Sequence, residues 1–272
     1  MSIVRRQIRI LGCGSSGGVP RIGGDWGACD PANPLNRRSR CSILIRQWSE
    51  GSDEPTQILV DTSPDIRHQL LDAGVKRLDA VFMTHRHADQ THGMDDLRAL
   101  VLVQRSLMPV YMDDSTADDL RARFGYCFTG ASAYPPILEL RRELAPGREI
   151  VLGEGGPGGA VKLTPLLLDH GTISSLGLRL GAFGYCNDVV RIPEETLGKL
   201  HGLDMLVVDA LRDRPHPTHA NVDQALAWIE ALKPRRAVLT NLHTDLDYEA
   251  LRGRLPANVE PAFDGMEFDV PV

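Results

Sequence analysis

The order of strand-like and helix-like segments places this chain in the α/β class. Strands are expected in both halves of the 272 residues, and segments with helical spacing lie between them. Neither a repeat nor a linker divides the chain, so we expect one domain over residues 1–272. Apolar residues make up 42% of the sequence, which is enough for a large core. Two sheets packed face to face and covered by helices would fit this order, and so would a single parallel sheet.

The first half alternates between strands and helices. Apolar runs predict strands at residues 7–11, 41–45, 57–61, 80–83 and 110–112. Helical spacing predicts helices at residues 63–71, 94–104 and 115–124. Ser63 and Pro64 are typical of the first turn of a helix, and Gly74 is typical of the residue just after its end.

The second half is mainly strand. It opens with a stretch rich in Pro and Gly at residues 131–159, which contains one expected strand at 149–152. The other strands are expected at residues 161–168, 178–180, 184–186, 205–208 and 237–239. One helix is expected at residues 222–232.

The glycine-rich turn at residues 12–20 is a weak signal for a nucleotide site. Its glycines at positions 12, 14 and 17 match part of a dinucleotide-binding motif. That motif must open a helix, and here Pro20 and the pair Gly23 and Gly24 follow instead. A Rossmann fold is therefore not expected.

Composition excludes several classes of protein. The net charge is −6, so stable binding to nucleic acid, which usually needs a basic surface, is not expected. No apolar run approaches the ~18 residues of a membrane span, and the N-terminus lacks the apolar stretch of a signal peptide. The five cysteines are too few and too scattered for a disulfide framework. We expect a cytoplasmic protein whose cysteines are small apolar core residues.

The strongest local signal for chemistry lies at residues 84–93. His85 and His87 follow a buried strand at a spacing of two, and Asp89 follows two residues later. Two imidazoles and a carboxylate on one short loop suit a borderline metal such as Zn²⁺. The alternative is a polar loop that happens to contain histidines, but the carboxylate and the preceding strand favour the metal.

Other candidate ligands also stand at the ends of predicted strands. They are His170, Asp188, His219 and His243. A sheet scaffold builds a site by placing polar side chains at strand ends, so we expect these residues near the histidine loop. His68 and His201 lie in polar, helix-like segments and are expected on the surface.

These motifs together resemble the metallo-β-lactamase superfamily, and within it a branch of phosphodiesterases. The glycine-rich turn and Asp61 resemble the opening of that branch, and residues 85–89 resemble its His-x-His-x-Asp motif. Residues 27–30, 36–38 and 92–98 are similar to bacterial phosphoribosyl cyclic-phosphate phosphodiesterases of phosphonate breakdown. The resemblance covers nearly the whole chain. It implies an αββα sandwich of two mixed β-sheets flanked by helices, with a metal site at one edge.

The resemblance implies two metal positions. The first would take His85, His87, His170 and Asp188. The second would take Asp89, the bridging Asp188 and two further histidines, but this sequence has Gln90 and Asn241 in their places. Because an amide oxygen binds Zn²⁺ much less well than an imidazole, we expect one Zn²⁺ or Mn²⁺ per chain and a weakened second site. Relatives also carry a structural zinc on several cysteines, which is not expected here.

The implied activity is opening of a small cyclic phosphate, phosphoribosyl or nucleoside, by a metal-bound hydroxide. Asp89 would accept a proton or orient the water, and His219, at the family's general-acid position, would protonate the leaving group. The candidate substrate contacts are Gln90, Asn241, Arg37 and Arg38. Guanidinium suits phosphate, although the two arginines fit a solvated basic turn equally well.

The sequence leaves three other functions open. A tRNA 3′-processing endonuclease is disfavoured by the acidic net charge and by the lack of a long projecting insertion. A thioester or lactone hydrolase is mildly disfavoured by the arginine-rich segment. A non-catalytic metal-binding homologue would explain a damaged second site. The expected partner is a small phosphodiester substrate, and a homodimer is left open.

Overall fold

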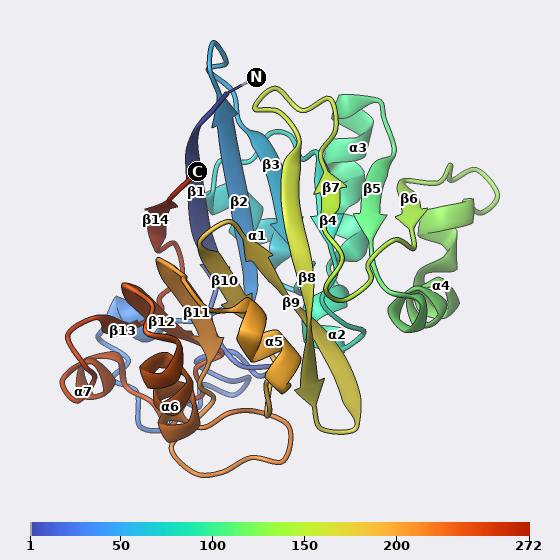
Figure 1. Cartoon of the computed structure of the whole chain (residues 1–272). Helices are drawn as coiled ribbons and strands as arrows, with labels where there is room; N and C mark the ends of the chain where they lie inside the picture. Colours follow the sequence, from blue (N-terminus) through green and yellow to red (C-terminus); the bar gives the residue numbers. More distant parts are fainter. Residues whose placement is uncertain (1) are drawn as a thin grey trace.

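Two seven-stranded sheets pack face to face, with helices on both outer faces (Figure 1). The computed structural model describes residues 2–272. The first sheet has the order β14-β1-β2-β3-β4-β5-β6 and the second β13-β12-β11-β10-β9-β8-β7. Both sheets are mixed, because antiparallel pairs at one side give way to parallel pairs such as β3–β4 and β10–β11. The αββα sandwich is therefore confirmed, and the single parallel sheet is wrong.

The strands of the first sheet come from both ends of the chain. They are β1 (Ile3–Gly12), β2 (Ser42–Ser49), β3 (Thr56–Val60), β4 (Ala80–Phe82), β5 (Met108–Tyr111), β6 (Leu138–Arg141) and β14 (Glu267–Val270). Those of the second are β7 (Ile150–Leu152), β8 (Val161–His170), β9 (Ile173–Leu180), β10 (Phe183–Cys186), β11 (Met205–Asp209), β12 (Arg236–Thr240) and β13 (Val259–Pro261).

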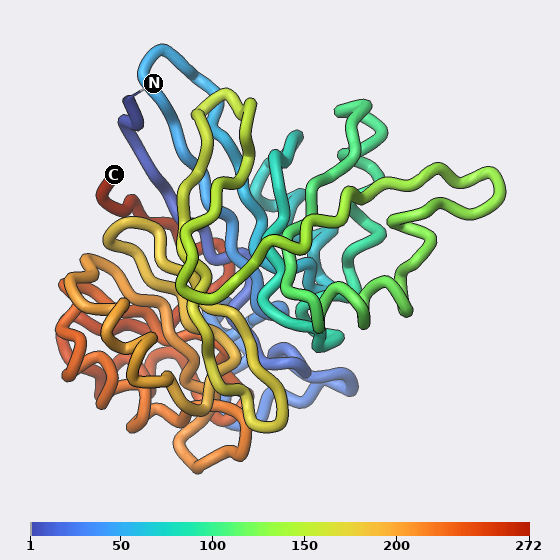
Figure 2. The backbone as a smooth tube through the Cα atoms, turned by 45° about the vertical axis from the view of Figure 1, so that its right-hand side comes forward, coloured from blue at the N-terminus to red at the C-terminus, as the bar shows by residue number. Residues whose placement is uncertain are grey.

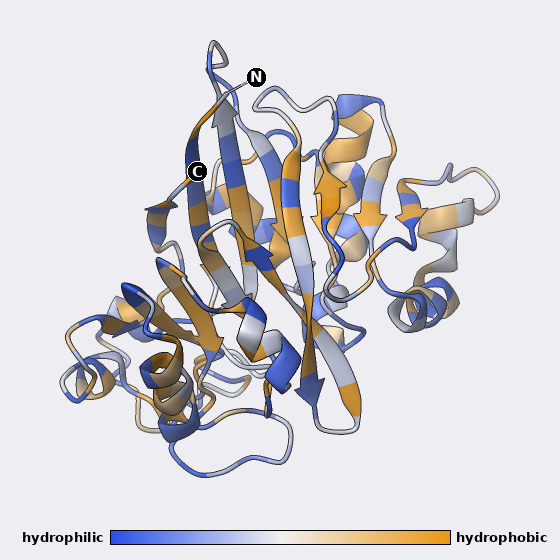
Figure 3. Ribbon diagram, in the orientation of Figure 1, coloured by the Kyte–Doolittle hydropathy of each residue, from blue (hydrophilic) through white to orange (hydrophobic). Residues whose placement is uncertain are grey.

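The main core lies between the two sheets. Alternate side chains of β1 and β2, such as Ile8, Ile10, Ile43 and Ile45, face it and are fully or almost fully buried. Their neighbours, such as Leu44, face the helices instead, so an alternating strand serves two apolar layers. Figure 3 shows this alternation of apolar and polar bands along the strands.

The helices cover the outer faces. The first sheet carries α1 (Ile66–Asp72), α3 (Arg98–Gln104) and α4 (Asp114–Thr129), and a short α2 (Ala88–Thr91) precedes α3. The second sheet carries α5 (Glu194–Lys199), α6 (Val222–Leu232) and α7 (Tyr248–Arg252). Two 3₁₀ turns, η1 (Pro34–Asn36) and η2 (Met94–Leu97), complete the elements. Figure 2 shows the connection between α4 and β6 projecting from the body.

Several elements differ from the sequence-based prediction. The first helix begins at Ile66 rather than Ser63, because the Ser63 hydroxyl and carbonyl accept hydrogen bonds from the next residues and form a separate turn. Strand β8 extends beyond its predicted end to His170, and strand β9 already begins at Ile173. Gly171, with φ +72°, allows the tight turn between them. The prediction missed the short elements α2, α5, α7, β6, β13 and β14.

One edge of the sandwich, which faces down in Figure 1, carries the carboxyl ends of six strands: β3, β4, β8, β10, β11 and β12. The two parallel runs and the β8 strand all direct their carboxyl ends there. Within residues 2–272, no helix combines the length and the apolar content that crossing a bilayer requires.

Candidate metal centre

Three histidines from two sheets gather at this edge. His85 and His87 follow β4, and His170 ends β8. Their ring centroids lie 4.7 to 5.1 Å apart, and one nitrogen of each ring lies within 4.8 Å of the others. His85 and His170 are buried, whereas His87 is exposed. The structure therefore brings together the three histidines that the sequence predicted as metal ligands.

Hydrogen bonds fix which ring nitrogen of His85 and of His170 is free. Asp61 accepts from the backbone N–H of Thr84 at 2.7 Å and from its hydroxyl at 2.8 Å. The Thr84 oxygen can then accept from Nδ1–H of His85 at 2.9 Å, so the lone pair of His85 lies on Nε2. His170 Nδ1 donates to the carbonyl of residue 218 at 2.7 Å, which likewise leaves the lone pair on Nε2.

The free nitrogens are what a metal ion would need. His85 Nε2 is buried and has no hydrogen-bond partner among the described residues. His170 Nε2 lies 3.1 Å from Nδ1 of His87, so a cation or a proton must separate the two nitrogens. Burial lowers the pKa of His170 to about 4 and that of His85 well below its usual range. Both rings are therefore neutral at pH 7, as ligation requires.

Asp188 supplies the carboxylate of this cluster. It follows β10, is buried, and places Oδ1 3.9 Å from His170 Nε2. Burial raises the pKa of Asp188 well above its usual range, and a cation would offset that cost. Asp61, Asp188 and Asn241 all have φ between +53° and +64°, a conformation that L-residues rarely adopt. The residues at the first metal position fit a divalent ion such as zinc, bound by three imidazoles and a carboxylate.

Amide side chains stand beside the carboxylates at the second position. Gln90 is fully buried, and its Nε2 lies 3.2 Å from Oδ2 of both Asp89 and Asp188. Asn187 Nδ2 donates to the same oxygen of Asp188 at 2.5 Å. Amide N–H groups thus satisfy the carboxylate oxygens that would face a second ion. Asn241 Nδ2 similarly donates to Oδ1 of Asp209 at 3.2 Å.

His219 lies beside His170, on the loop between β11 and α6, and is partly buried. Its ring centroid is 4.7 Å from that of His170, and its Nδ1 is 2.8 Å from Oδ2 of Asp209. Burial favours the neutral ring, but the Asp209 carboxylate outweighs this and raises the pKa of His219 to about 9. Because Nδ1 is held by Asp209, Nε2 is the nitrogen left for a ligand. Sequence reasoning missed Asp209, although it directly follows the predicted strand at 205–208.

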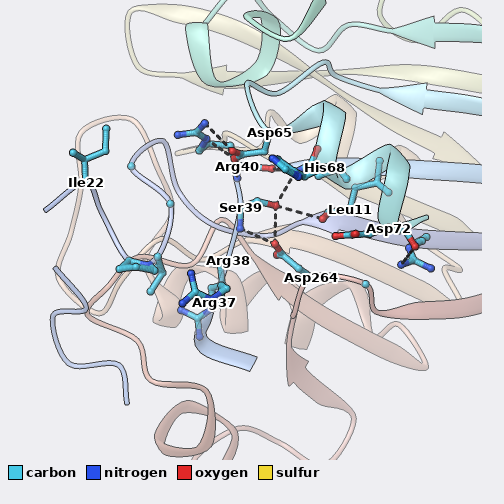
Figure 4. A pocket seen from close by; sticks show the side chains of 17 residues that line it. Leu11, Ile22, Arg37, Arg38, Ser39, Arg40, Asp65, His68, Asp72 and Asp264 are labelled. Atoms are coloured by element: carbon cyan, nitrogen blue, oxygen red, sulfur yellow. Dashed lines mark hydrogen bonds and ion pairs between the residues drawn. The ribbon is translucent and has the colours of Figure 1, made fainter. Parts of the chain in front are cut away.

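Arg37 and Arg38 do not lie in the histidine cluster. Both line a separate cavity of about 540 Å³ between the glycine-rich turn and α1 (Figure 4). The Arg38 guanidinium is buried and donates to the carbonyl of His243 and to Asn36 Oδ1 at 3.4 and 3.2 Å. Arg37 is exposed and stacks over Trp26 at 5.2 Å. Packing thus encloses most of the Arg38 side chain, and a contact of Arg37 or Arg38 with substrate stays a prediction.

Asp264 also lines this cavity and joins the glycine-rich turn to Ser39 through hydrogen bonds. It accepts from the backbone N–H of Cys13 at 3.0 Å. It also accepts from the backbone N–H and from the hydroxyl of Ser39, both at 2.6 Å (Figure 4). Burial raises the pKa of Asp264 to about 6. His68 and His201 are exposed, as predicted, and all five cysteines are buried free thiols.

The sandwich and the histidine cluster at its edge define a class, the metal-binding proteins of the metallo-β-lactamase fold. Residues 56–241 match the profile of a family described as the beta-lactamase superfamily domain. A solved structure described as a new diphosphatase from the PhnP family is 33% identical, with a TM-score of 0.85 over 99% of this chain and all of that one. The chain belongs to the metallo-β-lactamase superfamily and, within it, to the PhnP family.

Two further proteins resemble this chain less closely or over only part of their own length. Zn²⁺-bound PqqB from Methylobacterium extorquens shares the fold at 17% identity, with a TM-score of 0.69 over 97% of this chain and all of that one. An octanoyltransferase of Porphyromonas gingivalis is 33% identical over 263 residues, which is 95% of this chain and 50% of that protein. The chain therefore spans about half the length of this curated relative.

Proposed function

We propose that this metallo-hydrolase cleaves a phosphodiester bond in a small molecule, with a cyclic phosphate or a diphosphate ester as the candidate substrate. The observation that carries the proposal is the set of free imidazole nitrogens beside Asp188, on a chain 33% identical to a PhnP-family diphosphatase. We also propose one zinc or manganese ion per chain. The Gln90 amide supports this, because it donates to both carboxylates that a second ion would need.

His85, His87, His170 and Asp188 would hold the ion. When bound, it supplies the positive charge that activates a water and neutralises the phosphate. Asp89 takes one proton of the attacking water, whose oxygen forms a new bond to phosphorus. The bond from phosphorus to the leaving oxygen breaks, and His219 Nε2 gives that oxygen a proton. Asp209 keeps His219 oriented for this transfer through its 2.8 Å hydrogen bond to Nδ1.

The test measures turnover of bis(p-nitrophenyl) phosphate by the zinc- or manganese-loaded protein. We expect turnover that a chelator removes, and a loss of at least ~100-fold in His170→Ala. His201→Ala is the matched control, because this histidine is exposed and belongs to neither group of candidate metal ligands. Metal-loaded protein that binds the ion but leaves every phosphate ester intact would support the non-catalytic alternative instead.

Acyl chemistry is a second candidate, suggested by the name of the octanoyltransferase relative. Half of that protein lies outside the match, so its name describes a longer protein. A thioester assayed beside the phosphate ester separates the two functions. Faster turnover of the thioester would contradict the phosphodiesterase proposal.

A further inference from the structure

His87 differs from the other two histidines of the cluster in how its ring is held. A hydrogen bond from Nδ1 orients each of His85 and His170. The His87 side chain is exposed, and within residues 2–272 the only hydrogen-bond contact of its ring joins its Nδ1 to His170 Nε2. These two nitrogens are the ones that would face an ion. Because Nδ1 is the ring nitrogen nearer to the main chain, the position of this ligand atom depends on the backbone of His87.

Hydrogen bonds hold the peptide groups on both sides of His87. Its own carbonyl accepts from the Thr91 hydroxyl at 2.9 Å and from the backbone N–H of Gln90 at 3.1 Å, both in the adjoining α2. The preceding carbonyl, that of Arg86, accepts from Nη1 of Arg123 at 3.0 Å. Arg86 separates the two histidines of the ligand motif. A side chain of α4 therefore contacts the middle of that motif.

Asp119 orients Arg123 toward this carbonyl. It lies one turn earlier on α4, with Oδ1 2.7 Å from Nε of Arg123 and Oδ2 2.7 Å from Nη2. A two-point pair of this kind fixes the plane of the guanidinium and leaves Nη1 for the Arg86 carbonyl. The Arg86 side chain is attached to α4 as well. Its Nη1 donates to the Ser115 hydroxyl oxygen at 3.1 Å, and its Nε lies 3.6 Å from Asp119.

We propose that Arg123 is a positioning residue for the metal centre: it fixes the peptide group between Arg86 and His87, and with it the place of the His87 Nδ1 atom. This inference rests on the proposed metal ion, and it does not depend on which bond the protein cleaves. Groups that orient metal ligands typically change metal affinity ~10- to 100-fold. Arg123 is partly exposed and acts through one hydrogen bond, so we expect the lower end of this range.

The charge of Arg123 gives the test a sign. A guanidinium repels a nearby cation, so its removal should tighten metal binding if charge alone matters. Loss of the hydrogen bond to the Arg86 carbonyl should instead weaken metal binding. An exposed ion pair between Arg123 and Asp119 that only stabilises α4 would leave metal affinity unchanged. The three interpretations of Arg123 thus predict three different results.

The experiment measures zinc affinity by competition with a chelator. Arg123→Ala should weaken binding about 10-fold, and Arg123→Lys should recover part of the loss, because an ammonium group still donates. Arg121→Ala is the matched control. It removes the same charge from the same helix, and the exposed Arg121 makes no hydrogen bond or ion pair among the described residues. Unchanged or tighter binding in Arg123→Ala, or equal weakening in Arg121→Ala, would overturn the proposal.

Cobalt(II) in place of zinc reports on the ligands directly, because its visible absorption depends on their number and geometry. The spectrum of Arg123→Ala should shift from that of wild type toward that of His87→Ala. The spectrum of Arg121→Ala should match wild type. A wild-type spectrum in Arg123→Ala would show that His87 is positioned without α4, and it would overturn the proposal.

Asp119→Ala is a second variant that does not alter Arg123 itself. It should also weaken zinc binding, and the double variant should lose little more than Arg123→Ala, because Asp119 acts through Arg123. Additive losses would contradict this order of action. Should Arg123→Ala fail to fold, Asp119→Ala is compared with Arg121→Ala in the same two measurements.

These measurements need no turnover, so they separate this inference from the proposed function. If zinc affinity follows the expected pattern but no phosphate ester is hydrolysed, the proposed activity fails and the positioning role stands. If esters are hydrolysed and all variants bind zinc equally, the activity stands and the positioning role is refuted. A wild-type protein that binds no zinc, manganese or cobalt would refute both.

Discussion

Replacing Gln90 and Asn241 together by histidine should convert a one-metal site into a two-metal site. The two imidazoles would join Asp89 and Asp188, whose facing oxygens now accept from the Gln90 amide. Metal content should rise from one to two equivalents per chain. Either single variant should gain far less, because three ligands bind an ion more weakly than four, so the effects should not add.

The structure gives the size of the accompanying change in stability. Gln90 makes two hydrogen bonds of 3.2 Å to carboxylates, each contributing about 1.5 kcal/mol. An imidazole can donate to only one of them, so the metal-free double variant should lose roughly 1.5 kcal/mol, or about 4 °C in Tm. A second ion present at ~100 times its Kd adds roughly 2.7 kcal/mol. The sign of the Tm difference from wild type should therefore reverse when metal is added.

Calorimetric melting with and without zinc measures this reversal, and elemental analysis after dialysis measures the metal content. Turnover of bis(p-nitrophenyl) phosphate should rise with the second ion, since a cation stabilises developing oxygen charge better than an amide does. A double variant that melts lower than wild type in both conditions and holds one ion would refute this reasoning. Gln90 and Asn241 would then be substrate contacts or simply structural.

Three further outcomes are expected. Thr84→Val should weaken zinc binding about 10- to 100-fold in a chelator competition, because nothing then orients His85, whereas Thr84→Ser should retain it. His170→Ala should lose its metal in elemental analysis and His243→Ala should keep it; the reverse pattern would mean that the third ligand is misidentified. Folding raises the pKa of Asp264 to about 6, from ~3.9 unfolded, so its contribution is largest below pH 4 and is lost as the pH rises through 6. Relative to Asp264→Asn, wild type should therefore gain about 1 kcal/mol in urea unfolding between pH 7 and pH 5, and a constant difference would contradict the shifted pKa.

The gathering of the candidate ligands could be predicted because these residues share a recognisable position. His85, His87, His170 and Asp188 each follow an apolar strand, and the first two have the spacing of a motif. Thr84 and Asp209 act through other residues, and neither a threonine nor a single aspartate has a distinctive spacing. Their roles depend on hydrogen bonds that only the folded chain creates.

Long-range packing explains the other failures. β14 pairs with β1 from the opposite end of the chain, and its four residues carry too short a pattern to stand out. Arg38 lies in a polar, arginine-rich stretch, yet the packing of distant loops against it buries its guanidinium. The local composition predicts an exposed side chain at this position. It carries no information about the contact with His243, which is 205 residues away in the sequence.

The candidate metal ligands come from both halves of the sandwich: His85 and His87 from the first sheet, His170 and Asp188 from the second. An ion held by all four would act as a cross-link between the sheets, much as a disulfide joins distant parts of a secreted chain. Its release would remove that cross-link at the edge where the loops are longest, and unfolding would become faster. The supply of the ion would thus set the lifetime of the protein against proteolysis as well as the number of active sites.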